Sequence, residues 1–269
     1  MTNIGIIGAN GRMGKMLIQA VCQNPKAKLV GAIERTGSAF VGVDAGELVN
    51  IGNIGVQLVD DLTQVIDKID VLIDFSLPQS TEKNLAICVK HGVNMVIGTT
   101  GLSDSQNAFV KQASQNIAIV YAGNYSTGVN LSLKLLAIAG RAFGETADVE
   151  IIESHHKHKI DAPSGTAYMM ANTIANARGQ NLKDVAVYGR KGQTGERQAG
   201  SIGIHALRGG EIVGDHTVMF IADDEIVEIT HKACDRKAFA TGAVRAAMWV
   251  VQQQSGLFDM QDVLGLNLV

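Results

Sequence analysis

The sequence lacks several features that mark secreted, metal-binding and nucleic-acid-binding proteins. It has only three cysteines, Cys22, Cys88 and Cys234, which are widely spaced and form no CxxC pair. This odd set excludes a disulfide framework and a thiolate zinc site, and it favours a reducing compartment. Lys and Arg total 23 against 26 for Asp and Glu, so the chain has no large positive field to attract a nucleic-acid backbone.

Long apolar runs and a secretory start are also missing. The apolar stretches end well short of the roughly 20 residues that a membrane helix needs. Met1–Asn3 leads directly into a strand-like run, with no basic segment and no cleavage site. Proline is rare, at 3 residues, whereas 30 glycines allow many close backbone approaches. The 269 residues, 46% of them hydrophobic, predict a soluble cytoplasmic protein of two domains that binds neither membrane nor nucleic acid.

In the first half of the chain, short apolar runs alternate with segments of helical spacing. The runs are apolar throughout, which is typical of strands covered on both faces. The expected strands are Ile4–Ile7, Leu29–Ile33, Val71–Phe75, Met95–Ile97 and Ile117–Tyr121, and the helices between them include Met13–Cys22, Ser80–His91 and Ser103–Ser114. This order predicts an α/β domain over residues 1–126, built on a doubly wound parallel sheet.

The pattern changes near residue 127. A long amphipathic helix is expected at Gly128–Phe143, a strand at Val149–Ser154 and a further helix from about Ser164. Gly-Gly or Asp-Asp turns, which predict hairpins, separate three later strands, at Ser201–Leu207, Ile212–Phe220 and Ile226–Lys232. We therefore expect a second, α+β domain at residues 127–236 on an open mixed or antiparallel sheet. Residues 189–200 should form a mobile surface loop, and the tail, residues 237–269, should pack back on the first domain.

Three glycines spaced by three connect the first strand to the first helix. The segment Gly8–Gly14 reads GxxGxxG, whereas the strict dinucleotide fingerprint is GxGxxG. Gly8 permits the tight turn, Gly11 lets the backbone approach a pyrophosphate, and Gly14 lets the helix pack closely on the strand. The helix N-terminus would hold phosphate, with Arg12 adding a cation. A glycine-rich turn without a ligand is the alternative.

Polar residues at other strand ends extend this prediction. Glu34 follows Gly14 by 20 residues, where an acid commonly binds the adenosine ribose hydroxyls. Arg35 beside it could accept the 2′-phosphate of NADP, so the pair suggests that both NADH and NADPH are used; an exposed ion pair is the alternative. Gly98–Gly101 and Ala122–Tyr125 should lie at the same edge of the sheet and face the nicotinamide half of the cofactor.

The most chemically loaded stretch is Glu153–Ala167, with the sequence ESHHKHKIDAPSGTA. If the strand continues this far, alternation places His155, Lys157 and Lys159 on one face, where they could receive an anionic substrate. Pro163–Thr166 is typical of a helix N-terminus, which is a second anion site. Two such sites suit a small dicarboxylate, and a histidine beside lysines is a candidate proton donor.

A metal site is not favoured in this stretch. His155 and His156 are adjacent and would point opposite ways on a strand, and the two lysines would repel a cation. A solvated basic turn is the other alternative. The remaining histidines are isolated and are expected to be structural; they are His91, His205, His216 and His231.

Taken together, Gly8–Gly14, Gly98–Gly101 and Glu153–Thr166 closely resemble the dihydrodipicolinate reductase (4-hydroxy-tetrahydrodipicolinate reductase) family. The resemblance covers essentially the whole chain, including Gly214–Thr217 and Glu228–Lys232. Its His-Lys block is highly specific, whereas the glycine loop alone is not. The family implies a Rossmann-like N-terminal domain, a C-terminal substrate and assembly domain on a mixed sheet, and a homotetramer. It also implies NAD(P)H-dependent reduction of a cyclic dicarboxylate in diaminopimelate and lysine biosynthesis.

The resemblance also implies roles for individual residues. His155 would donate the proton, and Lys159 would assist protonation and bind the substrate. The other residues implied to bind the substrate are His156, Ser164, Gly165 and Thr166. Those implied to bind NADH or NADPH are Gly8, Ala9, Asn10, Gly11, Arg12, Met13, Glu34, Arg35, Gly98, Thr99, Thr100, Ala122, Gly123, Asn124 and Tyr125. No metal is implied.

The chain departs from the family pattern at three positions. Asn10 is often glycine in relatives, and Tyr125 is often phenylalanine. Leu77 stands where some relatives carry a basic residue, which leaves the balance between NADH and NADPH open. Two other functions also stay open: a different nicotinamide-dependent dehydrogenase of an amino-acid pathway, such as one acting on a semialdehyde, and a dinucleotide sensor, which would not need the histidine-lysine cluster.

Overall fold

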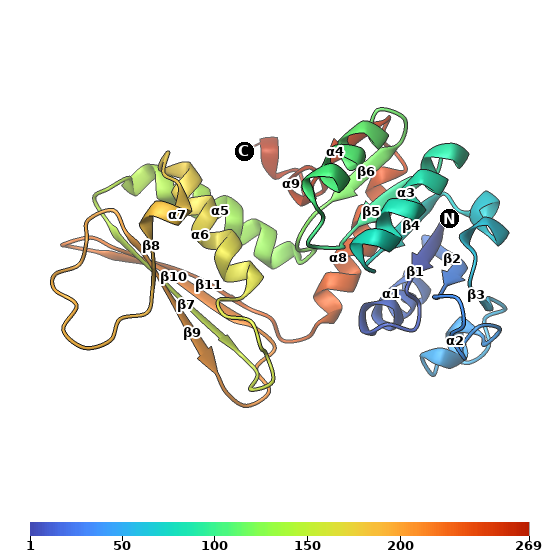
Figure 1. Cartoon of the computed structure of the whole chain (residues 1–269), viewed down its shortest axis with the longest axis horizontal. Helices are drawn as coiled ribbons and strands as arrows, with labels where there is room; N and C mark the ends of the chain where they lie inside the picture. The colour runs from blue at the N-terminus through green and yellow to red at the C-terminus, as the bar shows by residue number, and fades with distance from the viewer. Residues whose placement is uncertain (269) are drawn as a thin grey trace. The chain divides into compact units, whose positions relative to one another are not determined.

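A computed structural model describes residues 1–268 of the chain (Figure 1). The chain divides into two compact units, one formed by Met1–Thr127 together with the chain from Lys237 onward, the other by Gly128–Arg236. The expected division after residue 126 differs from this one by a single residue. Among the described residues, no helix has the length and apolarity needed to cross a membrane.

The first unit is built on a seven-stranded parallel sheet with the order β12-β6-β5-β4-β1-β2-β3. Its strands are β1 (Thr2–Ile7), β2 (Ala27–Ile33), β3 (Leu58–Val59), β4 (Val71–Asp74), β5 (Asn94–Ile97), β6 (Ala118–Tyr121) and β12 (Gly256–Phe258). Helices α1 (Arg12–Gln23) and α8 (Lys237–Val250) pack on one face, and α3 (Pro78–His91) and α4 (Asp104–Ala113) on the other. The predicted doubly wound sheet is confirmed.

Burial on both faces explains why these strands are apolar throughout. Ile4 and Ile6 of β1 are buried in the core shared with α1 and α8. Leu72 of β4 and Met95 of β5 are buried in the core shared with α3 and α4. Each such side chain contributes roughly 1.5–3 kcal/mol through burial. The two cores hold the carboxyl ends of the strands at one edge of the sheet.

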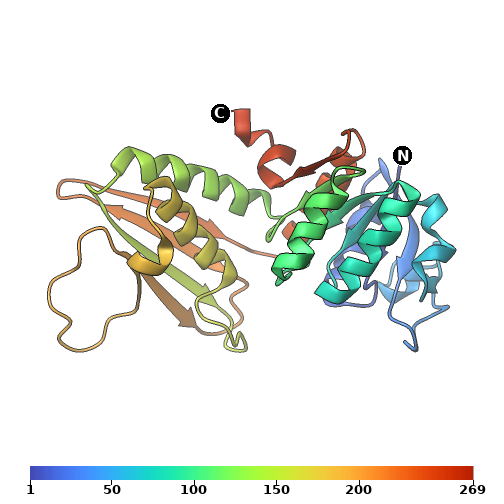
Figure 2. The same ribbon diagram turned by 45° about the horizontal axis from the view of Figure 1, so that its top comes forward.

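The second unit is built on a five-stranded mixed sheet with the order β11-β10-β7-β9-β8. Its strands are β7 (Asp148–His155), β8 (Ala186–Tyr188), β9 (Ile202–Arg208), β10 (Asp215–Ile221) and β11 (Ile226–Lys232). Figure 2 shows α5 (Thr127–Phe143) and α6 (Gly165–Ala177) on the same side of this sheet. Val149 and Ile151 of β7 point to that side and are fully buried against α6.

One hairpin expected from the sequence is wrong. The Gly209-Gly210 turn does not join neighbouring strands, because β7 lies between β9 and β10 and pairs in parallel with β9 and antiparallel with β10. The Asp223-Asp224 turn does close a hairpin, between β10 and β11. The sheet is therefore mixed, and β7 is its central strand.

Several short elements were not anticipated. They are α2 (Ala45–Leu48), α7 (Leu182–Val185), α9 (Met260–Val263), the 3₁₀ turns η1 (Leu62–Gln64), η2 (Ile66–Lys68) and η3 (Leu266–Leu268), and strands β3, β8 and β12. The loop at residues 189–200, expected to be mobile, is irregular but is tied to β7. Arg197 donates to Asp148 over 2.7 Å, and both Arg190 and Arg197 donate to Glu150.

Candidate active site

The glycine turn after β1 forms a backbone site suited to phosphate. Gly8 adopts φ +69°, a conformation that favours glycine. A Cβ at Gly14 would overlap the carbonyl oxygens of Gly8 and Ala9, so helix and turn touch at a position that only glycine fits. Gly11 caps α1, and within the described chain no side chain accepts from the first helical N–H groups. Such N–H groups can bind a pyrophosphate.

Glu34 lies directly against this turn. Its carboxylate accepts the backbone N–H of Asn10 at 3.0 Å. The side-chain oxygen of Asn10 is buried and has no hydrogen-bond partner in residues 1–268. A bound ligand could donate the hydrogen bond that this oxygen lacks. Glu34 and Arg35 also line a cavity of about 470 Å³. These residues fit the adenosine half of a dinucleotide.

The same cavity contains residues that the sequence did not single out. Most come from segments that follow β2, β3 and β4, whose positions depend on strand order rather than on a local motif. The polar members are Thr36, Asp60, Asp61, Ser76, Ser80, Lys83 and Asn84. Two cations, Arg35 and Lys83, therefore share the cavity with three carboxylates, Glu34, Asp60 and Asp61.

The ends of β5 and β6 hold residues with mainly structural contacts. Thr99 is buried, and its hydroxyl accepts from the Ser76 N–H at 3.1 Å. A Cβ at Gly98 would overlap the ring of Phe75, which explains that glycine. The Tyr125 ring is buried, and its hydroxyl donates to the Ile97 carbonyl at 2.8 Å. Contacts of Tyr125 with a cofactor would therefore have to come from its backbone.

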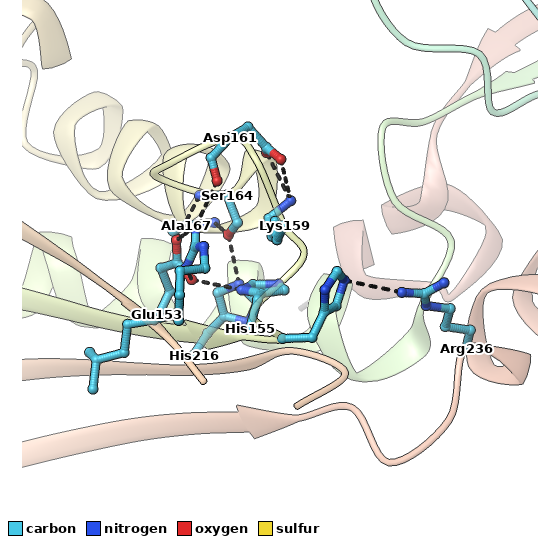
Figure 3. A network of polar contacts seen from close by, with 11 residues as sticks. Glu153, His155, Lys159, Asp161, Ser164, Ala167, His216 and Arg236 are labelled. Atoms are coloured by element: carbon cyan, nitrogen blue, oxygen red, sulfur yellow. Dashed lines mark hydrogen bonds and ion pairs between the residues drawn. The ribbon is translucent and has the colours of Figure 1, made fainter. Parts of the chain in front are cut away.

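The histidine-lysine block occupies the end of β7 and the turn that follows (Figure 3). The strand ends at His155, so the expected alternation that put Lys157 and Lys159 on its face is wrong. Lys157 lies 3.6 Å from Glu211 on the exposed turn. The Lys159 ammonium instead donates to both carboxylate oxygens of Asp161, each at 2.8 Å. The turn, not a strand face, positions Lys159.

His155 is held on three sides. Its Nδ1 lies 2.6 Å from the carboxylate of Glu153, which is fully buried. Its ring meets that of His216 edge-on, with centroids 5.2 Å apart. On the third side lies Gly214, where a Cβ would be only 3.0 Å from Nε2, so a larger residue would crowd this nitrogen.

Ser164 connects this histidine pair to the start of α6. Its hydroxyl accepts the Ala167 N–H at 3.1 Å, capping the helix, and lies 3.0 Å from Nε2 of His216. Among the described residues, a Cβ at Gly165 would meet no other atom within 4 Å, so the backbone here is open to a ligand. Burial, followed by the nearby charge of His155, lowers the pKa of His216 to about 4. His216, expected to be isolated, is part of the site.

Arg236 is a further residue that the sequence did not indicate. Its guanidinium donates to Nε2 of His156 at 3.3 Å (Figure 3). Desolvation, the charge of Arg236 and that of His158 lower the pKa of His156. Lys159, Arg236 and the α6 N-terminus give the second unit three groups that attract anions. Within residues 1–268 no group of three or more His, Cys, Asp or Glu side chains is arranged to hold a metal.

Comparison with known proteins gives the family. Residues 2–125 match the family model described as "Dihydrodipicolinate reductase, N-terminus", and residues 128–264 match "Dihydrodipicolinate reductase, C-terminus". The chain belongs to the dihydrodipicolinate reductase family. The resemblance inferred from the motifs is thereby confirmed.

Two bacterial dihydrodipicolinate reductases match over almost their whole length. The 4-hydroxy-tetrahydrodipicolinate reductase of Psychrobacter arcticus is 68% identical over 267 residues, which are 99% of this chain and 96% of that protein. The Acinetobacter baumannii protein of the same name is 56% identical over 264 residues, 98% of this chain and 96% of its own.

Solved structures agree on the fold. A dipicolinate-bound dihydrodipicolinate reductase from Paenisporosarcina sp. TG-14 has a TM-score of 0.78 at 26% identity, covering 97% of this chain and 98% of its own. A myo-inositol dehydrogenase from Corynebacterium glutamicum has a TM-score of 0.61 at 15% identity, covering 100% of this chain and 94% of its own. At this identity the likeness concerns the fold alone.

Proposed function

We propose that this chain is a 4-hydroxy-tetrahydrodipicolinate reductase that uses NADH or NADPH. The observation that carries the proposal is the block Glu153–Thr166, which brings His155, Lys159 and the N-terminus of α6 around one turn. It occurs in a chain that is 68% identical to a protein of that name over 99% of its length.

The first unit would hold the cofactor. The N–H groups at the start of α1 would bind the pyrophosphate, and Glu34 would accept the ribose hydroxyls. Arg35 would pair with a 2′-phosphate when one is present, which supports use of both NADH and NADPH. When bound, the nicotinamide supplies the hydride for the reduction. The residues that would line the nicotinamide half follow β5 and β6. They are Gly98, Thr99, Thr100, Ala122, Gly123, Asn124 and Tyr125.

The second unit would hold the cyclic dicarboxylate and deliver a proton. Lys159, His156 and the backbone of Gly165 and Thr166 would bind its carboxylates, since an ammonium group, an imidazole N–H and a helix N-terminus all attract anions. Nε2 of His155 would donate the proton that completes the reduction, because Nδ1 is already bound to Glu153.

A coupled assay tests the proposal. The substrate is made enzymatically from pyruvate and aspartate semialdehyde, and the loss of reduced-nicotinamide absorbance is followed with NADH and with NADPH. We expect oxidation that depends on the dicarboxylate and falls about 10²–10⁴-fold in His155→Ala, the range for removal of a general acid. Cofactor oxidation with a semialdehyde alone would instead indicate another dehydrogenase. Cofactor binding without oxidation would indicate a sensor.

We also propose that the chain works as a cytoplasmic homotetramer. The face of the second sheet opposite α5 and α6 leaves apolar side chains exposed, namely Ile152 at 37%, Leu207 at 51% and Ile226 at 60%. Such a face is typical of a surface that another subunit covers. All three cysteines are free, which suits a reducing compartment. Light scattering after gel filtration should give four times the chain mass of 28.5 kDa; a monomer at micromolar concentration would contradict the tetramer.

A further inference from the structure

Glu153 is a charged side chain buried beside the candidate active site, and the proposed reaction gives it no role. It lies on β7 two residues before His155 and has no exposed surface. An ionised carboxylate in such a place needs hydrogen bonds to every lone pair it presents. Burial raises its pKa, but hydrogen bonds from Arg208, His155 and the Ser164 N–H outweigh this effect and hold its pKa below the ordinary value of 4.5. Glu153 is therefore an acceptor only.

The two oxygens of Glu153 divide their partners between different parts of the site. One oxygen accepts from Nδ1 of His155 at 2.6 Å, and the other accepts the backbone N–H of Ser164 at 2.9 Å. Arg208 donates to both oxygens, each at 2.8 Å, and so fixes the plane of the carboxylate. The same guanidinium donates to the Asp161 carbonyl at 2.6 Å. The Glu153–Arg208 pair thus contacts the strand end, the turn and the helix start.

These contacts determine which nitrogen of His155 is left free of Glu153. Since ionised Glu153 can only accept, Nδ1 of His155 must carry a hydrogen. Nε2 is then the nitrogen left to exchange its proton with a substrate, and any side chain at Gly214 would crowd it, because a Cβ there would lie 3.0 Å away. The Ser164 N–H bound to the other oxygen begins the helix whose N-terminus would receive a carboxylate.

We propose that Glu153, held in plane by Arg208, is a positioning residue that aligns the proton-donating nitrogen of His155 with the carboxylate-binding start of α6. The inference rests on the proposed function, because the orientation of His155 affects the reaction only if His155 donates the proton. Glu153 does not itself touch the substrate. It sets the geometry between two groups that do, in the way that supporting hydrogen bonds fix a catalytic constellation.

Glu150 provides a matched control on the same strand. It also accepts from two arginines and a histidine: Arg190 at 2.8 Å, Arg197 at 3.1 Å and His205 at 2.7 Å. These partners tie the loop at residues 189–200 to β7 and β9, and none of them belongs to the candidate active site. Glu150→Gln and Glu153→Gln therefore each remove from β7 a carboxylate that is paired with arginine and histidine. Only Glu153→Gln removes the partner of His155.

The test compares the full-length protein with these two variants in the coupled assay. We expect Glu153→Gln to lower kcat about 10²-fold, as displacement of a catalytic group does, and to leave the dissociation constant for NADH unchanged. Glu150→Gln should keep kcat near that of the wild type. The ¹⁵N chemical shifts of the His155 imidazole should show hydrogen on Nδ1 in the wild type and a mixture of neutral tautomers in Glu153→Gln.

Several results would overturn the inference. One is wild-type kcat in Glu153→Gln, and another is an equal loss of kcat in both variants with the His155 tautomer unchanged. If Glu153→Gln does not accumulate as folded protein, Arg208→Lys takes its place, because lysine keeps the charge but cannot bind both oxygens in plane; wild-type kcat there would equally reject it. If the wild type does not reduce the dicarboxylate, the proposed function fails, while the tautomer comparison still decides whether Glu153 orients His155.

Discussion

His216 makes the second unit sensitive to mild acid. Its pKa is about 4 in the folded chain because burial, and then the charge of His155, disfavours the imidazolium, against 6.5 for the free side chain. Unfolded chains therefore bind more protons than folded ones between these two values, and stability falls as pH drops through that window. A shift of this size corresponds to about 3 kcal/mol in full, of which about 2 kcal/mol is lost between pH 7 and 5.

Urea unfolding at pH 7 and pH 5 measures this effect. The free energy of unfolding of the wild type should fall between the two values of pH, and that of His216→Gln should fall less. Glu150 does not interfere, because its partners hold its pKa at about 2 and its contribution is lost only in stronger acid. His231, whose pKa burial also lowers, contributes to wild type and variant alike. Parallel losses in the two proteins would mean that His216 titrates normally.

Lys159 and Lys157 differ in what their ammonium groups can reach. Lys159 is held by Asp161 beside the start of α6, whereas Lys157 pairs with Glu211 on an exposed turn. Replacing Lys159 with methionine would remove the charged hydrogen bond to the substrate that we propose for it, and such a bond is worth about 1.5–3 kcal/mol. We expect the KM for the dicarboxylate to rise and kcat to fall in Lys159→Met, with both constants near wild type in Lys157→Met. An unchanged KM in Lys159→Met would remove it from the substrate site.

At the scale of elements, the join between β1 and α1 depends on Gly14. Alanine there would push its Cβ into the carbonyl oxygens of Gly8 and Ala9, which are backbone atoms and cannot move aside alone. Gly14→Ala should therefore shift α1 away from the strand, lower Tm and abolish NADH binding. Gly8→Ala is the comparison, because its Cβ has room and only the positive φ is strained, at about 1–2 kcal/mol. Similar losses of Tm in the two variants would contradict the steric argument.

Local periodicity was sufficient to predict the long elements and the glycine turn. Strands buried on both faces, such as β1 and β4, are continuously apolar, and their length and spacing identify a parallel sheet. Elements of two to four residues, such as β3 and α2, have too few positions to show a period. Strand neighbours are also not local, which is why β7 between β9 and β10 was missed.

In the second unit, the candidate site was predictable only where its residues are close in sequence. His155, Lys159 and Ser164 belong to one block and were found together. Their remaining partners come from distant segments, since Arg208 lies 55 residues from Glu153 and His216 lies 52 from Ser164. Neither partner has a local pattern that indicates a contact with the block. Their roles follow only from the register in which β9 and β10 flank β7.

At the scale of the whole molecule, the two units carry different binding chemistry. The first offers backbone N–H groups, the carboxylate of Glu34 beside them and a cavity of mixed charge. The second offers cations, a helix N-terminus and the imidazole of His155, with its own core and sheet. Each ligand of the proposed reaction should therefore stabilise the unit that binds it. A ligand that binds only the folded unit lowers the free energy of the folded state relative to the unfolded one.

Hydrogen exchange followed by mass spectrometry tests this division. NADH alone should slow exchange in peptides that contain Gly8–Gly14 and Glu34, whereas dipicolinate, a planar dicarboxylate, should slow it in peptides that contain His155–Thr166. In Gly14→Ala, NADH should no longer slow exchange in the Gly8–Gly14 and Glu34 peptides, since that substitution disturbs the α1 turn. Dipicolinate should still slow exchange in the His155–Thr166 peptides. Protection by NADH alone that is confined to peptides of residues 128–236 would show that the cofactor binds elsewhere. The assignment of the glycine turn would then be wrong, whatever the enzyme reduces.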